Sequence, residues 1–157
     1  NVPFTFPNGC HAAEIEIDPD TGGLELLRYL CADDYGRILN LKLTIGQIRG
    51  GVAQGVGQAL GELAAYDPTS GQLIAGSMMD YYLPTASSLP ALEINLSKGI
   101  PSNANPLGVK GCGQAGAIAA PQTLINAILD ALSPLGIDHI DMPATSETIW
   151  RAIQAAR

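Results

Sequence analysis

The sequence has 157 residues, of which 46% are hydrophobic, and this length fits a single domain or a fragment of a larger one over residues 1–157. Fifteen acidic against eight basic side chains give a formal net charge of -7, and no run of Lys or Arg is present that could follow a phosphate backbone, so nucleic-acid binding is not expected. No stretch approaches the roughly 20 continuous apolar residues that cross a bilayer, so we predict no membrane partner.

The N-terminal part is predicted to form a β-hairpin. Apolar and acidic residues alternate over 13–18, a period of two that places the apolar set on one face of a strand. Residues 18–23 have turn chemistry, and 24–32 are expected to return as the second strand. A short further segment is expected over 38–43.

A glycine-rich helix is predicted over 47–65, because apolar residues recur there at spacings of three and four. Five glycines interrupt it: Gly50, Gly51, Gly55, Gly57 and Gly61. Each glycine in a helix interior costs about 1 kcal/mol relative to Ala. Such a cost is retained where something approaches the backbone closely, and the sequence leaves open whether that is a neighbouring element or a ligand.

The remaining elements are predicted from the same signals. Strands are expected over 72–79, 91–97 and 137–142, with a second glycine cluster at 98–116. Helices are expected over 121–132 and after the capping residue Thr145, the last with Ile149, Trp150 and Ile153 facing inward. Strands and helices do not alternate regularly, so the fold class is α+β, with a mixed sheet, a glycine-rich helix and two further helices.

Three familiar kinds of site are disfavoured. Residues 111–116 match G-x-G-x-x-G, but no strand leads directly into them, which argues against a dinucleotide-binding fold. The cysteines and histidines lack metal-ligand spacing, so no metal site is predicted. The number of cysteines is odd, which favours a reducing compartment, the cytoplasm, over a secreted protein with disulfides. Cys112 as a nucleophile lacks an evident base and is expected to pack as a small side chain.

What remains is a cofactor-binding loop. Main-chain N–H groups around Lys110, freed by glycine, could bind a phosphorylated or polar cofactor, with Gln54 and Gln58 of the glycine-rich helix as a second surface. The alternative is that both glycine clusters serve only close packing.

Four stretches, residues 8–14, 46–60, 80–84 and 105–111, resemble the molybdenum hydroxylases, the family of xanthine dehydrogenase, aldehyde oxidoreductase and the aerobic carbon monoxide dehydrogenase large subunit. The resemblance covers nearly the whole chain and implies the C-terminal part of a molybdopterin-binding subunit. It further implies oxidation of small-molecule aldehydes or N-heterocycles with oxygen derived from water. The implied partners are the remainder of the subunit and the iron–sulfur and FAD subunits that receive the electrons.

The resemblance also implies which residues contact molybdopterin: Gln54, Gly55, Lys110, Gly111, Cys112 and Gly113. The family's catalytic base, a glutamate, corresponds to Gln114, and an amide does not accept a proton near neutral pH. Loss of a general base costs about 10²–10⁴-fold in rate. Two hypotheses follow: a working hydroxylase module with another proton route, or a non-catalytic scaffold. The isolated polypeptide is expected to contain no stoichiometric molybdenum.

Overall fold

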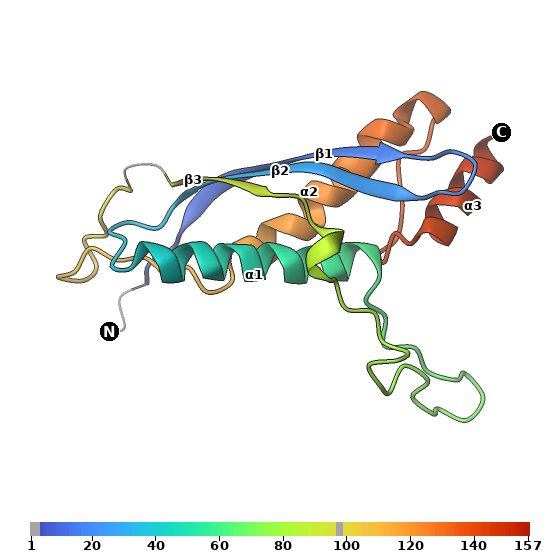
Figure 1. Ribbon diagram of the computed structural model, residues 1–157, viewed down its shortest axis with the longest axis horizontal. Helices are drawn as coiled ribbons and strands as arrows, with labels where there is room; N and C mark the ends of the chain where they lie inside the picture. The colour runs from blue at the N-terminus through green and yellow to red at the C-terminus, as the bar shows by residue number, and fades with distance from the viewer. Residues whose placement is uncertain (1–3, 97–98) are drawn as a thin grey trace.

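The computed structural model describes residues 4–96 and 99–157 and has an α+β fold, as predicted. In chain order its elements are β1 (Asn8–Ile17), β2 (Leu24–Asp34), α1 (Leu41–Leu60), η1 (Ala86–Ser88), β3 (Leu92–Leu96), α2 (Ala115–Leu132), η2 (Ser133–Leu135) and α3 (Ser146–Ala156). The sheet has the order β1-β2-β3 (Figure 1). The hairpin strands β1 and β2 are antiparallel, whereas β2 and β3 are parallel, so the predicted mixed sheet is confirmed.

One face of the sheet is covered by helices. Side chains of β2 and β3 pack with α1 and α2 in one buried cluster, while the opposite face carries the exposed ion pair of Arg28 with Glu93. A bulge in the hairpin pairs Glu14 with Arg28 and Ile15 with Leu26. Because the intervening Leu27 has no partner on β1, the alternation of β2 shifts there and leaves Leu27 exposed.

The helices α1 and α2 pack through glycine. A Cβ on Gly55 would lie 2.6 Å from Cβ of Ala120, and one on Gly116 would lie 2.8 Å from the Ile48 carbonyl oxygen. A Cβ on Gly51 would lie 3.0 Å from the main-chain nitrogen of Ala117. For these glycines the neighbour that requires a bare backbone is another helix.

A second core cluster joins the C-terminal half of α2 to α3, with Ile128, Ile149 and Ile153 buried in it. Thr145 caps α3 as predicted, its side-chain oxygen accepting a hydrogen bond from the Thr148 N–H. Trp150, predicted to face inward, is 40% exposed and lies against Gly22 in the hairpin turn. Residues 137–142 do not form the predicted strand; Ile140 is buried in this cluster without strand pairing.

The helix boundaries differ from the predicted ones. The short segment expected over 38–43 is wrong, because α1 begins at Leu41, where the Asn40 side chain accepts a hydrogen bond from the Leu43 N–H. The same helix ends at Leu60 rather than near residue 65. Helix α2 begins at Ala115, so Pro121 lies inside it instead of in its first turn.

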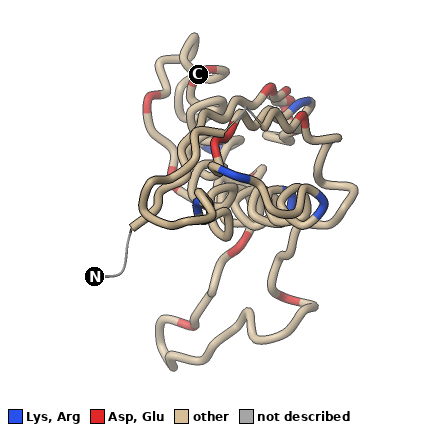
Figure 2. The backbone as a smooth tube through the Cα atoms, turned by 90° about the vertical axis from the view of Figure 1, so that its left-hand side faces the viewer, with Lys and Arg blue, Asp and Glu red and all other residues tan. Residues whose placement is uncertain are grey.

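The strand predicted over 72–79 is also wrong. The segment between α1 and η1 forms an arm that extends away from the body in both views (Figures 1 and 2). Within the arm, the bridge between Tyr66 and Leu73 replaces a strand ladder, and Met79 is 93% exposed. Without a neighbouring strand or a core to cover it, the apolar pattern has no sheet to join.

By length and composition, Ala115–Leu135 could cross a membrane, with a mean hydropathy of 1.2. The segment nevertheless contains Gln122, Asn126 and Asp130, and α2 packs against α1 and β1. These are the contacts of a core helix.

Candidate functional site: a glycine loop beside a glutamine-lined hollow

The loop that joins β3 to α2 is fastened to the end of β2. The N–H of Lys110 donates to the Tyr35 carbonyl at 3.1 Å, and the N–H of Arg37 donates to the Gly108 carbonyl at 2.9 Å. The Asn105 side chain bonds both the N–H and the carbonyl of Val109. Residues 105–110 are therefore held by hydrogen bonds from the main chain and from the Asn105 side chain, although they form no helix or strand.

A largely buried ion pair adds to this attachment. Nζ of Lys110 lies 2.7 Å from Oδ2 of Asp34, and the two side chains are only 11% and 12% exposed. The hydrogen bond from Lys110 and another from the Gly36 N–H hold the pKa of Asp34 below its usual range. The ammonium group that the sequence assigned to the cofactor thus points to Asp34.

Beyond Lys110 the loop is bare. A Cβ on Gly111 or Gly113 would meet no atom within 4 Å. Among the described residues, no hydrogen bond uses the N–H of Gly111, Cys112 or Gly113, while the Gly113 carbonyl accepts one from Gln47 of α1 at 2.7 Å. The loop tip therefore presents unpaired donors, which require a partner or water.

A hollow of about 330 Å³ lies at Gln114, the residue that follows this tip, between α1 and the first turns of α2. Its polar lining consists of four glutamines, Gln54, Gln58, Gln114 and Gln122, with Ala117, Ile118 and Pro121 between them. No side chain of this lining is charged. An amide both donates and accepts hydrogen bonds, so the hollow suits a ligand whose surface is polar and uncharged.

The structure thus brings some predicted site residues together and separates others. Gln54 and Gln114 share the hollow, whereas Gly55 is covered by α2. Cys112 lies in a second hollow of about 360 Å³, with Tyr35 and Lys110. Sequence reasoning missed Gln122 because it began the helix at Pro121; with α2 beginning at Ala115, Gln122 lies two turns beyond Gln114, near the same face.

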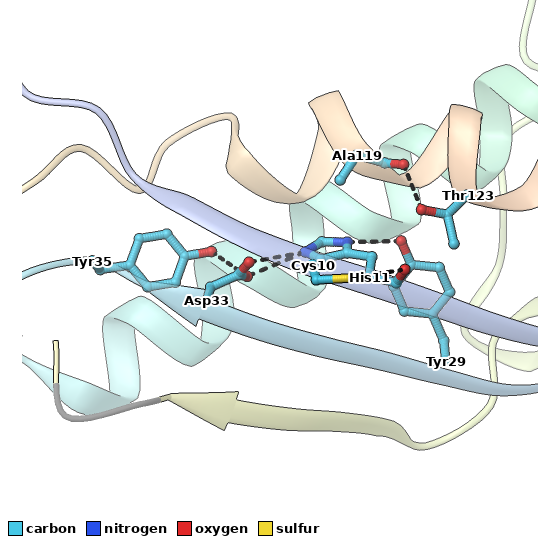
Figure 3. Close-up of polar contacts among 7 residues, drawn as sticks. All are labelled: Cys10, His11, Tyr29, Asp33, Tyr35, Ala119 and Thr123. Carbon is cyan, nitrogen blue, oxygen red and sulfur yellow. Dashed lines mark hydrogen bonds and ion pairs between the residues drawn. The ribbon is translucent and has the colours of Figure 1, made fainter.

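A buried polar network lies beneath the site and ties β1 to the end of β2 (Figure 3). Nδ1 of His11 lies 2.8 Å from the Tyr29 hydroxyl, and Nε2 lies 3.2 Å from both carboxylate oxygens of Asp33. The Tyr35 hydroxyl donates to Asp33 at 2.7 Å. The hairpin register, which pairs His11 with Cys31, explains how one cross-strand neighbourhood collects these groups.

The electrostatics of this network follow from burial and hydrogen bonding. Burial by itself raises the pKa of Asp33, but hydrogen bonds from His11 and Tyr35 outweigh it and hold that pKa below its usual range. Burial raises the pKa of Tyr29 and of Tyr35 above that of a free tyrosine. Both ring nitrogens of His11 have partners. We therefore assign the network a structural role, which is to hold the end of β2 against β1.

Two acids in apolar parts of the chain, Glu62 and Glu93, are engaged away from the hollow. Glu62 accepts a hydrogen bond from the Tyr81 hydroxyl at 2.7 Å in the arm, and Glu93 pairs with Arg28 on the outer face of the sheet. Neither lines the glutamine hollow. Within residues 4–96 and 99–157, no group of three or more metal-ligating side chains is found.

Comparison with known proteins identifies the relatives of the chain. The family model of the molybdopterin cofactor-binding domain matches residues 1–90. The nicotine 6-hydroxylase large subunit of Paenarthrobacter nicotinovorans is 44% identical over 94% of the chain, and the carbon monoxide dehydrogenase large chain of Hydrogenophaga pseudoflava is 34% identical over 96%. The chain covers 18% and 19% of these relatives, about a fifth of their length. The structure of quinoline 2-oxidoreductase from Pseudomonas putida 86 superimposes with a TM-score of 0.90 at 39% identity, over 94% of this chain and 19% of that one.

Proposed function

Because the chain belongs to the molybdopterin cofactor-binding domain family, as its resemblance to the molybdenum hydroxylases predicts, we propose that it forms the C-terminal part of the molybdopterin-binding subunit of such a hydroxylase. The observation that carries the proposal is the bare loop tip, with its unpaired N–H groups, beside a hollow lined by glutamines. The remainder of the subunit, together with iron–sulfur and FAD subunits, completes the enzyme in the cytoplasm.

The residues present fit a pterin. A pterin is a flat heterocycle edged by hydrogen-bond donors and acceptors, and amide side chains and main-chain N–H groups complement such an edge without charge. Gln54 from α1 and the N–H groups of Gly111, Cys112 and Gly113 would hold it. When bound, the molybdenum centre would supply the two-electron oxidation, and this chain would bind and orient the cofactor.

N-heterocycles are the proposed substrate class. Relatives named for nicotine and quinoline are 44% and 39% identical to the chain, whereas the aldehyde oxidoreductase subunit PaoC of Escherichia coli is 29% identical. On this ground, aldehydes are the second candidate substrate class.

By its resemblance to the family, Gln114 corresponds to the family's base, and in our proposal it orients a bound molecule by donating and accepting hydrogen bonds. A second function, a cofactor-binding module without turnover, is favoured by one observation: the lining of the hollow contains no carboxylate. The two functions differ in whether a base from outside this chain serves the site.

The test is Gln114→Glu in the complete subunit, purified with its partner subunits. We expect molybdenum content to stay unchanged, because Glu keeps the length of Gln. For the catalytically silent module, hydroxylation of N-heterocycles should rise from background by about 10²-fold or more, the contribution of a general base. For a working enzyme with another base, the wild type already turns over and the gain is small. Absence of molybdenum from both proteins would refute the cofactor-binding role.

A further inference from the structure

The carboxylate of Asp34 makes two different attachments. Its Oδ1 accepts the Gly36 N–H at 2.7 Å, which fixes the carboxylate to its own strand end. Its Oδ2 accepts from Lys110 Nζ at 2.7 Å, across 76 positions of sequence. The Asp34 carboxylate is therefore fixed to the end of β2 through Oδ1 and binds the loop through Oδ2.

The stem of the loop is packed closely around this pair. A Cβ on Gly36 would lie 2.5 Å from the Gly108 carbonyl oxygen and 3.1 Å from Cγ of Lys110. A Cβ on Gly99 would collide with the Gly36 carbonyl oxygen and lie 2.8 Å from Oδ1 of Asp34. These close approaches leave little space for the Lys110 side chain to adopt another conformation.

Two anchors fix the loop tip between them. Lys110 is attached to β2 through Asp34, and the Gly113 carbonyl is attached to α1 through Gln47. Gly111 and Cys112 lie between these anchors, and Gln114 follows directly. A segment containing two glycines has many accessible conformations when free, so its orientation depends on its fixed ends.

We propose that Asp34 and Lys110 act as one positioning pair, which fixes the main chain of 111–113 and thereby the position of the Gln114 side chain in the glutamine-lined hollow. The role rests on the proposed function. In this role the charge of Lys110 acts through Asp34 and not directly on the cofactor, which departs from the cofactor contact predicted for Lys110 from the sequence.

The test is a double-mutant cycle in the complete subunit, purified with its partner subunits. Asp34→Asn removes one charge and keeps an acceptor for Gly36; Lys110→Met removes the other and keeps the aliphatic stem. We measure molybdenum and released pterin per subunit, and hydrogen exchange of peptides covering 111–114. Each single variant should lose cofactor occupancy and exchange protection roughly tenfold, as for a hydrogen bond between charged groups, and the double variant should lose no more.

The matched control is Glu93→Gln, which breaks an exposed ion pair of the same sheet on its outer face and should leave both readouts unchanged. Lys110→Arg, which preserves the pair, should retain wild-type protection and tests the role if the neutral variants fold poorly. A loss in Lys110→Met without a loss in Asp34→Asn overturns the proposal, because Lys110 would then act directly. If the wild-type complex holds no molybdenum, the proposed function fails, while unchanged exchange at 111–114 in Asp34→Asn separately overturns the positioning pair.

Discussion

Replacing Gly116 by Ala tests whether bare backbone is required where α1 and α2 cross. The added Cβ would lie 2.8 Å from the Ile48 carbonyl oxygen and 2.8 Å from the Val52 nitrogen, both main-chain atoms of α1. Favourable contacts lie at about 3.5–4.0 Å, so the helices must separate by about 1 Å. Overpacking of this kind costs about 1–3 kcal/mol, and the gain in helix propensity offsets at most about 1 kcal/mol. With an overpacking cost of about 2 kcal/mol, the middle of that range, the expected net loss is about 1–2 kcal/mol of unfolding free energy.

The assay is urea unfolding of the 157-residue chain, followed by far-ultraviolet circular dichroism. Gly50→Ala on α1 is the matched control, because a Cβ there would meet nothing within 4 Å. This control should stabilise the chain by about 0.5–1 kcal/mol through helix propensity alone. The two substitutions, chemically identical, are thus expected to shift the midpoint in opposite directions. A Gly116→Ala chain as stable as the wild type would refute the argument from close approach.

The pH dependence of stability and the reactivity of the cysteines give two more predictions. Because the pKa of Asp33 is lowered in the folded chain, its contribution is present above the ordinary aspartate pKa of about 3.9 and is lost as pH falls through the folded value. Asp33→Asn should therefore be less stable at pH 6 and lose less stability between pH 5 and pH 3 in urea titrations; an unchanged acid dependence contradicts this reasoning. Burial raises the pKa of Cys31 to about 11, with the Asp33 charge adding to the effect, so Cys31 should resist thiol labelling at pH 8 until urea unfolds the chain, while exposed Cys10 reacts at once. Equal labelling rates for the two thiols in the native chain would show that Cys31 is accessible.

The parts of the fold that are predictable from sequence are those governed by local signals. The hairpin follows from alternation and turn residues, and α3 follows from Thr145 as its cap. The start of α2 was not predictable in this way, because its first turns are rich in Gly and Ala and Pro121 imitates a helix start. The strand expected over 72–79 failed because strand formation needs a neighbour, which no local pattern supplies.

The site divides similarly. Gln54 was identified from its place on the glycine-rich helix and again through family resemblance, and Gln114 through the resemblance alone; the structure places both in one hollow. The attachment of Lys110 to Asp34 joins residues 76 positions apart, and without the fold no spacing rule connects them. Sequence analysis therefore assigned the lysine to the cofactor, from its charge and from the family resemblance.

The question left open by the sequence, whether glycine serves packing or a ligand, has a separate answer for each cluster. In α1, Gly51 and Gly55 lie against α2, and filling either position would push the helices apart. In the loop, Gly111 and Gly113 have no neighbour that a Cβ would meet. Closely packed helices set the distance between Gln54 and Gln114, while the loop tip keeps its main chain accessible. Since both anchors of that tip, Asp34 and Gln47, belong to this chain, we expect the proposed cofactor-binding surface to be shaped before the remainder of the proposed subunit docks.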